Sequence, residues 1–205
     1  MREGPQVSAR GTVSRPSADA AHSSGRDERV LLDRIGARDL QAFEKLYRIY
    51  QPRLARFLSN LLQRPQLVEE VLDDTMMVVW QTAGSFRGAS KVSTWIFAIA
   101  YRKAARAKAR WPDPIEPDAH DTRVSEDPDP DDQLRHQRLH DALKTAMKHL
   151  SPDHRAVVDL TYSHELGYRE IAEIMECPVD TVKTRMFHAR RRLKEAMAGK
   201  LSDWI

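Results

Sequence analysis

Apolar residues recur every three or four positions through most of this chain. This spacing places apolar side chains along one side of an α-helix. No segment shows the strict alternation of apolar and polar residues that is typical of a β-strand. The pattern therefore predicts an all-α protein. The clearest run contains Leu40, Phe43, Leu46, Tyr47, Tyr50, Leu54, Phe57, Leu58, Leu61 and Leu62.

Punctuating residues divide the helical pattern into elements. Pro52 should kink the first helix or start a second one. Ser151 is followed by Pro152 and Asp153, and a hydroxyl cap, an early proline and a carboxylate all favour a helix N-terminus. Further helices are expected at about 67–83, 92–110 and 134–150, and from Ser151 onward.

The segment 111–132 differs sharply from its surroundings. It holds five of the eleven prolines of the chain, and nine acidic residues against one arginine. Such a segment cannot bury enough apolar surface to pack, so we expect a flexible acidic linker. It separates two small helical domains, at 29–110 and 133–205. Residues 1–28 lack an apolar run and are expected to form a disordered extension to which no function is assigned.

Composition excludes several classes of protein. With 31% charged residues, 8 glycines and 1 cysteine in 205 residues, the chain is neither collagen-like, nor disulfide-stapled, nor a membrane bundle. No stretch approaches the ~18 apolar residues that a membrane span requires. We expect a cytoplasmic protein without direct membrane insertion. The net charge of +3 is too small to identify a partner.

The C-terminal region has the pattern of a helix-turn-helix. A short helix at 168–175 and a longer helix at 179–198 are separated by a turn at 176–178. One stripe of the longer helix is apolar, so the opposite face should be exposed. The apolar stripe contains Val182, Met186, Ala189 and Leu193.

That opposite face carries the residues expected to bind duplex DNA. Six Lys or Arg residues and no acid lie within 183–194, which favours contact with phosphates. Exposed Phe187 suits a thymine methyl group or a deoxyribose. Lys183 and Arg191 should position the backbone, and Thr184 and His188 could reach base edges.

The N-terminal region pairs an acidic helix with a basic one. Glu69, Glu70, Asp73 and Asp74 lie within two turns and repel one another, which costs helix stability unless a basic partner meets them. A solvated acidic face is the alternative, and a metal site is a weaker one. In the helix at 92–110, Arg102, Arg106 and Arg110 align on one face that could follow a phosphate backbone, and Trp95 and Phe97 are expected in the core.

The order of these segments resembles the bacterial extracytoplasmic-function sigma factors. The resemblance covers about residues 30–198. It implies a region 2-like helical bundle and a region 4-like helix-turn-helix, without enzymatic activity or cofactor. The segments that carry it are AFEKLYRIYQPRL, VEEVLDDTMMVVWQ, SFRGASKVSTWIFAIAYRKA and LSPDHRAVVDLTYSHELGYREIAEIMECPVDTVKTRMFHARRRL.

The resemblance also implies partners and site residues. The partners are core RNA polymerase, promoter DNA and an anti-sigma factor, and the active protein would associate with the nucleoid. The residues expected to bind polymerase are Glu69, Glu70, Asp73, Asp74 and Met77. Those expected at the minus-ten element are Arg87, Lys91, Ser93, Thr94, Arg102, Lys103 and Arg106. Those expected at the minus-thirty-five element are Thr181, Lys183, Thr184, Arg185, Phe187, His188 and Arg191.

Four positions depart from the family pattern. Arg102 stands where asparagine is usual, and Arg106 where aspartate is frequent, which adds phosphate attraction. Glu176 and Asp180 stand where glycine is common. If Glu176 adopts a left-handed turn conformation, the cost is about 1 kcal/mol, and Asp180 is expected to cap the following helix.

Other classes of function have less support. A free-standing helix-turn-helix regulator is the alternative, because it would need only the C-terminal region. For an enzyme, His164 and Glu165 lack the second histidine of a zinc-protease motif, and no glycine-rich phosphate loop occurs. His136 and His140 have helical spacing for a metal but lack further ligands, so no metal is expected. Cys177 is expected to pack as a small apolar residue.

Overall fold

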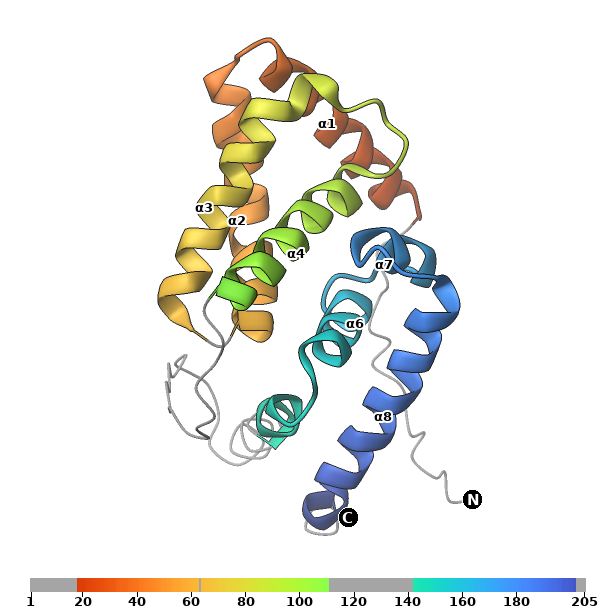
Figure 1. The fold of residues 1–205 in the computed structure, drawn as a ribbon. Helices are drawn as coiled ribbons and strands as arrows, with labels where there is room; N and C mark the ends of the chain where they lie inside the picture. Colours follow the sequence, from red (N-terminus) through yellow and green to blue (C-terminus); the bar gives the residue numbers. More distant parts are fainter. Residues whose placement is uncertain (1–17, 63, 111–141, 202–205) are drawn as a thin grey trace, which may run out of the picture.

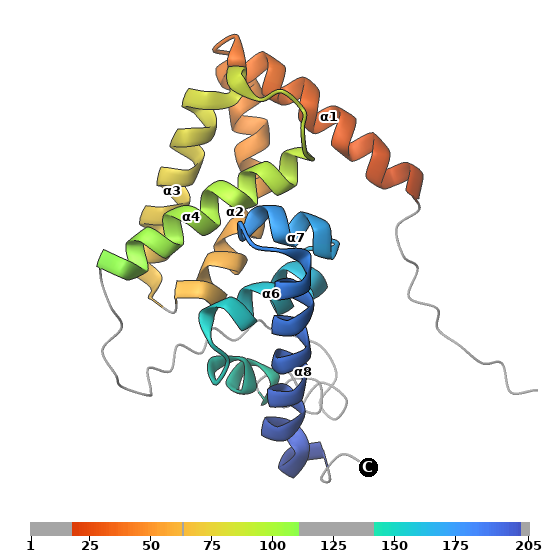
Figure 2. The ribbon, with the colours of Figure 1, turned by 45° about the vertical axis from the view of Figure 1, so that its right-hand side comes forward.

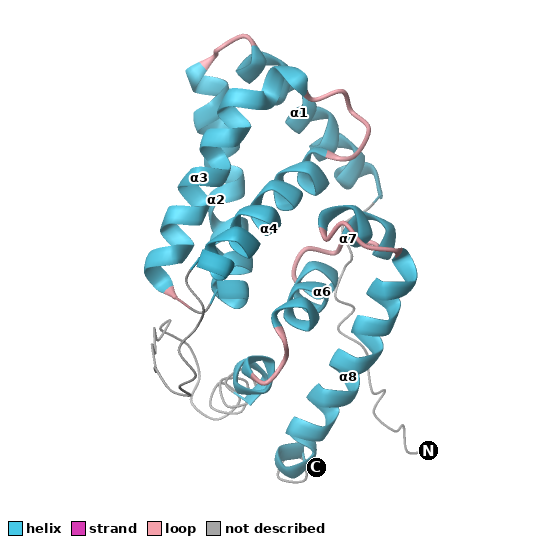
Figure 3. Ribbon diagram, in the orientation of Figure 1, coloured by secondary structure: helices cyan, strands magenta, loops and turns pink. Residues whose placement is uncertain are grey.

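The computed structural model describes residues 18–62, 64–110 and 142–201. Within these ranges every regular element is a helix and there is no strand (Figure 3), which confirms the all-α prediction. The predicted linker 111–132 and the histidine pair lie outside the described residues. The elements in order are α1 (Ala18–Gly36), α2 (Leu40–Leu62), α3 (Pro65–Thr82), the 3-10 helix η1 (Ala83–Ser85), α4 (Val92–Arg110), a helix at 142–148, α6 (Pro152–Tyr162), α7 (Tyr168–Ile174) and α8 (Val179–Leu201).

Helices α1 to α4 form the N-terminal module (Figure 1). Helix α2 runs without interruption through Pro52, which is exposed. Tyr50 before the proline and Leu54 after it are both fully buried. Packing of this apolar face therefore holds one continuous helix where the sequence left open a second one, because most helix stability in proteins comes from tertiary contacts.

Helix α1 begins at Ala18, inside the segment 1–28 that was expected to be disordered. Its C-terminal half is anchored to the module, since Leu32 and Ile35 are fully buried. The buried carboxylate of Glu28 accepts a hydrogen bond from the Tyr50 hydroxyl at 2.8 Å. Burial raises the pKa of Glu28, and the Tyr50 bond and the Arg53 charge oppose that rise. The helix thus begins eleven residues before the expected domain boundary at residue 29.

The C-terminal module contains the expected helix-turn-helix. The Ser151 hydroxyl caps α6 by accepting a hydrogen bond from the His154 N–H at 3.4 Å. In the turn between α7 and α8, Glu176 has a φ of 50°, which is the left-handed conformation. Val182 and Met186 of α8 are buried against α6 and α7. The predicted apolar stripe is therefore confirmed.

The two modules pack against each other and share one hydrophobic core. Helix α6 contacts α2, and α7 contacts α4 (Figures 1 and 2). The His164 side chain, in the turn after α6, lies against two rings of the N-terminal module. Its ring centroid is 6.1 Å from that of Phe57 and 4.5 Å from that of Phe97. The sequence pattern indicated two modules but not this shared core.

A close approach of two glycines generates the first prediction. A Cβ on Gly36 would lie 2.9 Å from the Cα of Gly84, whereas a Cβ on Gly84 would lie 3.6 Å from the Cα of Gly36. Gly36→Ala should lower the free energy of unfolding by about 1–3 kcal/mol, because backbone must move. Gly84→Ala, the matched control, should change it by less than about 0.5 kcal/mol. Urea unfolding measures both, and equal effects would contradict the packing described.

Candidate nucleic-acid interface

Helix α8 presents an exposed face opposite its buried stripe. Phe187 is 64% exposed, and Lys183, Thr184 and Arg191 are also exposed. The Lys183 ammonium lies 2.9 Å from the carboxylate of Asp180. Asp180 was expected to cap the helix, but its carboxylate bonds to Lys183. The face therefore offers cations, a hydroxyl and an aromatic ring to one partner surface.

Three further residues predicted for this face are less accessible. Arg185 turns inward, where its guanidinium lies 2.5 Å from the Asp153 carboxylate and 3.7 Å from the sulfur of half-buried Cys177. Thr181 and His188 are half-buried. Arg185 therefore joins α8 to α6 through its ion pair with Asp153, a contact that helical spacing alone could not reveal.

Arg190 and Tyr162 form a feature of this surface that the sequence analysis did not single out. The Tyr162 hydroxyl accepts hydrogen bonds from Nη2 and Nε of Arg190 at 2.9 and 3.1 Å. Tyr162 is 60% exposed, and the guanidinium lies 5.9 Å from its ring centroid. Arg190 follows Phe187 by three residues, so it lies beside it on the helix. No local signal connects it with Tyr162, which lies on another helix.

Burial and nearby positive charge favour the neutral imidazole of His154. The rings of His154 and His188 have centroids 6.3 Å apart. Burial, and after it the surrounding positive charges with Arg192 first, lowers the pKa of His154. His154 is thus expected to be neutral at physiological pH, and its Nδ1 lies 2.9 Å from the Ser151 hydroxyl.

The basic helix α4 carries the second group of predicted DNA-binding residues. Arg87, in the loop before it, and Arg106 are exposed, and Ser93 is half-buried. Thr94 is only 1% exposed, so the structure does not present it to solvent. Phe97 is fully buried and Trp95 half-buried, which confirms the core placement expected for both.

The three remaining cations predicted for the minus-ten element are paired with carboxylates. Lys103 lies 2.9 Å from Asp74 of α3. Lys91 lies 2.9 Å from Glu170 and Arg102 lies 2.8 Å from Glu176, both acids of the C-terminal module. Only part of the predicted minus-ten surface is therefore open in this arrangement of the chain.

The acidic face of α3 is exposed. Glu69 and Glu70 project into solvent, and Met77 is 54% exposed. Asp73 accepts a long hydrogen bond of 3.4 Å from the Tyr47 hydroxyl. The basic partner that the sequence required for these carboxylates is supplied in part by Lys103 on Asp74, while Glu69 and Glu70 make no ion pair within the described residues.

A polar cluster joins α2 to the C-terminal module. The Asn60 side-chain amide donates to the Asp159 carboxylate at 2.9 Å, and the other carboxylate oxygen lies 3.3 Å from Nε2 of His164. Burial opposes ionisation of Asp159, but the polar interactions with His164, Ser163 and Asn60 outweigh it and lower its pKa. The cluster keeps a carboxylate charged at a site where only 2% of its side chain is exposed.

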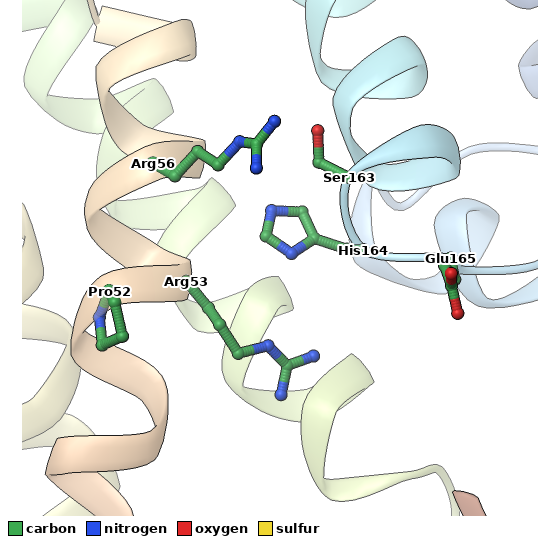
Figure 4. A pocket seen from close by; sticks show the side chains of 6 residues that line it. All are labelled: Pro52, Arg53, Arg56, Ser163, His164 and Glu165. Carbon is green, nitrogen blue, oxygen red and sulfur yellow. The ribbon is translucent and has the colours of Figure 1, made fainter. Parts of the chain in front are cut away.

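A hollow of about 380 Å³ lies beside this cluster, between α2 and the turn after α6 (Figure 4). Arg53, Arg56, Ser163 and His164 point toward it, while Glu165 points away. Arg53 also lies 4.9 Å from the ring centroid of Tyr50. The two guanidinium groups therefore border the polar cluster from the N-terminal module.

The described residues contain neither a metal-binding cluster nor a membrane-spanning helix. No group of three or more His, Cys, Asp and Glu side chains could hold a metal ion there. Of the helices described, none is both long and apolar enough to span a bilayer.

Family models match both modules. Residues 46–111 match sigma-70 region 2, and residues 140–193 match sigma-70 region 4. The first match covers α3 and α4 with part of α2, and the second covers α6 to α8 up to Leu193. Both modules of the fold, in this order, are therefore those of a sigma factor.

Curated relatives give the same result over almost their whole length. The chain is 29% identical over 188 residues to an ECF RNA polymerase sigma-E factor of Escherichia coli K12, covering 87% of this chain and 96% of the relative. It is 28% identical over 177 residues to that of Haemophilus influenzae, covering 82% and 93%.

Solved structures share the fold. The structure of CnrH in complex with the cytosolic domain of CnrY matches with a TM-score of 0.61 and 20% identity, over 84% of this chain and 98% of that one. RpoE of Bartonella quintana, in complex with the anti-sigma factor NepR, matches with a TM-score of 0.59 and 24% identity, over 76% and 96%. The chain belongs to the extracytoplasmic-function (ECF) RNA polymerase sigma factors, which direct transcription initiation.

The polar cluster generates a prediction about pH. Asp159→Asn should lower the free energy of unfolding by about 1–3 kcal/mol near neutral pH, because Asn60 and His164 lose a charged acceptor. Since the pKa of Asp159 is lowered on folding, its carboxylate stabilises the chain above its ordinary value of 3.8, and this is lost as pH falls through the folded value. The difference from the unsubstituted chain should therefore shrink on acidification below about pH 4.

Urea unfolding over a pH series measures this difference. Asp33→Asn is the control, because that exposed carboxylate makes a solvent-accessible pair with Arg29 and should change stability by less than about 1 kcal/mol. An Asp159→Asn effect that stays constant down to acidic pH would contradict the role given to the charge.

Proposed function

We propose that this sigma factor binds core RNA polymerase through α3 and reads two promoter elements through α4 and α8. The observation that carries the proposal is the exposed face of α8, where Lys183, Thr184 and Phe187 lie opposite a buried apolar stripe. A solvent-exposed phenylalanine beside cations suits a groove of duplex DNA. This face is assigned to the minus-thirty-five element.

The exposed acidic face of α3 is assigned to the polymerase. Glu69 and Glu70 are exposed neighbours of like charge, with Met77 two turns further along. A partner with basic side chains around an apolar contact would relieve the repulsion and cover Met77. The charge pattern and exposure of this face support the assignment.

The minus-ten element is assigned to α4 and the loop before it. Arg87 and Arg106 are exposed at its two ends, and cations at this spacing can follow a phosphate backbone. Covalent linkage of the modules, through 111–132, would raise the effective concentration of each at its element once the other is bound. The domain limits 29–110 and 133–205 belong to this proposal.

We further propose that an anti-sigma factor binds the chain, and that the chain acts in the cytoplasm, on the nucleoid, without catalysing a reaction. The support is the similarity to CnrH and RpoE, whose structures contain CnrY and the anti-sigma factor NepR. Copurification from unstressed cells tests this part. Recovery of core polymerase alone would refute it.

Reconstitution tests the main proposal. Transcript starts induced by overexpression identify a promoter, and purified chain plus core polymerase should then initiate from it. A gel shift with the chain alone distinguishes a sigma factor from a free-standing helix-turn-helix regulator, because such a regulator would bind that duplex tightly without polymerase. Absence of both core binding and promoter-dependent initiation would refute the sigma function.

The assignment of α3 predicts a charge effect on polymerase binding. Glu69→Lys combined with Glu70→Lys should weaken the affinity for core polymerase at least about fivefold, because two favourable contacts become repulsive. Asp27→Lys is the control, since Asp27 is an exposed acid of α1. Fluorescence anisotropy of labelled chain measures both. Equal affinity of the two variants would contradict the assignment.

The assignment of α8 predicts a DNA effect without a stability effect. Phe187→Ala should weaken holoenzyme binding to the mapped promoter about tenfold, through loss of an apolar base or sugar contact, and leave the free energy of unfolding nearly unchanged. Leu143→Ala is the control, because Leu143 is also an exposed apolar residue of this module, at 42% against 64%. Filter binding measures the affinity, and similar losses in both variants would contradict the assignment.

A further inference from the structure

Helix α7 and the turn after it place two carboxylates on the cations of α4 and its preceding loop. The Glu170 carboxylate lies 2.9 Å from the ammonium of Lys91. The Glu176 carboxylate lies 2.8 Å from the guanidinium of Arg102. Figure 2 shows α7 lying against α4 at this point. Both acids belong to the C-terminal module and both cations to the N-terminal module.

The polar groups between these pairs are also occupied. Thr94, 1% exposed, donates a long hydrogen bond of 3.5 Å to the same oxygen of Glu170. The Tyr101 hydroxyl donates to the Asp153 carboxylate at 2.9 Å. By contrast Arg87 and Arg106, outside this contact, are exposed and make no ion pair within the described residues. The middle of the α4 surface is covered and its ends are open.

The Glu170 carboxylate is oriented by its own module. One oxygen of Glu170 accepts the backbone N–H of Gly167 at 2.9 Å, which leaves the other for Lys91 and Thr94. Glu176 has a φ of 50°, a conformation that favours glycine, and its carboxylate reaches Arg102. One of the two carboxylates is therefore oriented independently of α4.

A carboxylate and a DNA phosphate compete for the same cation. Both accept charge-assisted hydrogen bonds from an ammonium or a guanidinium. The pairs are solvent-accessible, with Arg102 40% and Glu176 63% exposed, so each is weak alone. A contact of this kind can hold the chain closed and still be released by a partner.

We infer that the carboxylates of Glu170 and Glu176 act as an internal substitute for DNA phosphates on the α4 surface. In the free chain, α4 binds single-stranded DNA only after the contact between α7 and α4 has opened. The inference rests on the proposed assignment of α4 to the minus-ten element. The apparent affinity of the free chain for DNA is then reduced by the fraction of molecules that are open.

The test removes the two negative charges and keeps the shape of the two side chains. Glu170→Gln with Glu176→Gln leaves amide oxygens in place, including one for the Gly167 N–H. The variant should bind a fluorescent single-stranded oligodeoxynucleotide of mixed sequence roughly threefold to tenfold more tightly than the unsubstituted full chain. Adding Arg102→Ala should remove most of the gain, which places the DNA on α4 rather than on α8. Circular dichroism checks that each variant is folded.

The matched control changes the net charge equally. Glu165→Gln with Glu173→Gln removes two exposed carboxylates of the same module that make no ion pair within the described residues, and binding should stay within about twofold. An equal gain in both double variants would show a general charge effect and overturn the inference. A gain that survives Arg102→Ala would also overturn it.

Failure of the inference and failure of the proposed function are distinguishable. Promoter-dependent initiation by the unsubstituted chain with core polymerase tests the function alone. If initiation occurs and Glu170→Gln with Glu176→Gln binds DNA like the control, the internal contact is refuted and the sigma function stands. If initiation fails, the function itself is refuted.

Discussion

The turn after α6 inserts His164 against the rings of Phe57 and Phe97 in the other module. Edge contacts of this kind add about 0.5–1.5 kcal/mol beyond the burial of area. Beside the ring, the buried Asp159 carboxylate is compensated by Asn60 and His164, and a buried charge without such partners would be costly. This contact fixes α6 on α2, and through the short connection to α7 it sets where the acids of α7 meet α4.

Helix α4 is therefore shared between three environments. One side is core, with Ile96 and Phe97 fully buried. Its neighbouring cations Arg102 and Lys103 point to different partners, Glu176 in the C-terminal module and Asp74 on α3. Adjacent helical residues diverge by about 100° around the axis, so one short segment can serve both. Through the ion pairs of these two adjacent residues, α4 contacts both the acidic face of α3 proposed for polymerase and the C-terminal module.

Local patterns explain most of what could be predicted from the sequence. The periodicity of α2, α3, α4 and α8 and the Ser151 cap depend on residues a few positions apart, and each was predicted. Helix α1 was not predicted, because the helical pattern was identified only from Leu40 onward. The inward turn of Arg185, the pairing of Lys103 with Asp74 and the burial of Thr94 depend on elements distant in sequence. No spacing rule reports such contacts, so the predicted site was right about which helices carry charge and less reliable about which cations are free.

Arg102 and Glu176 are two of the positions at which this chain departs from the family pattern, and in the structure these two residues contact each other. A glutamate at a φ of 50° is strained by about 1 kcal/mol relative to glycine. Arg102, for its part, adds to the repulsion among the cations of α4. When the two modules close, the carboxylate neutralises that arginine at 2.8 Å. A solvent-accessible pair contributes at most about 1 kcal/mol. The strain at Glu176 lies in the turn between α7 and α8 and does not depend on the contact with α4. This pair by itself is therefore weak enough for binding of DNA or polymerase to displace it.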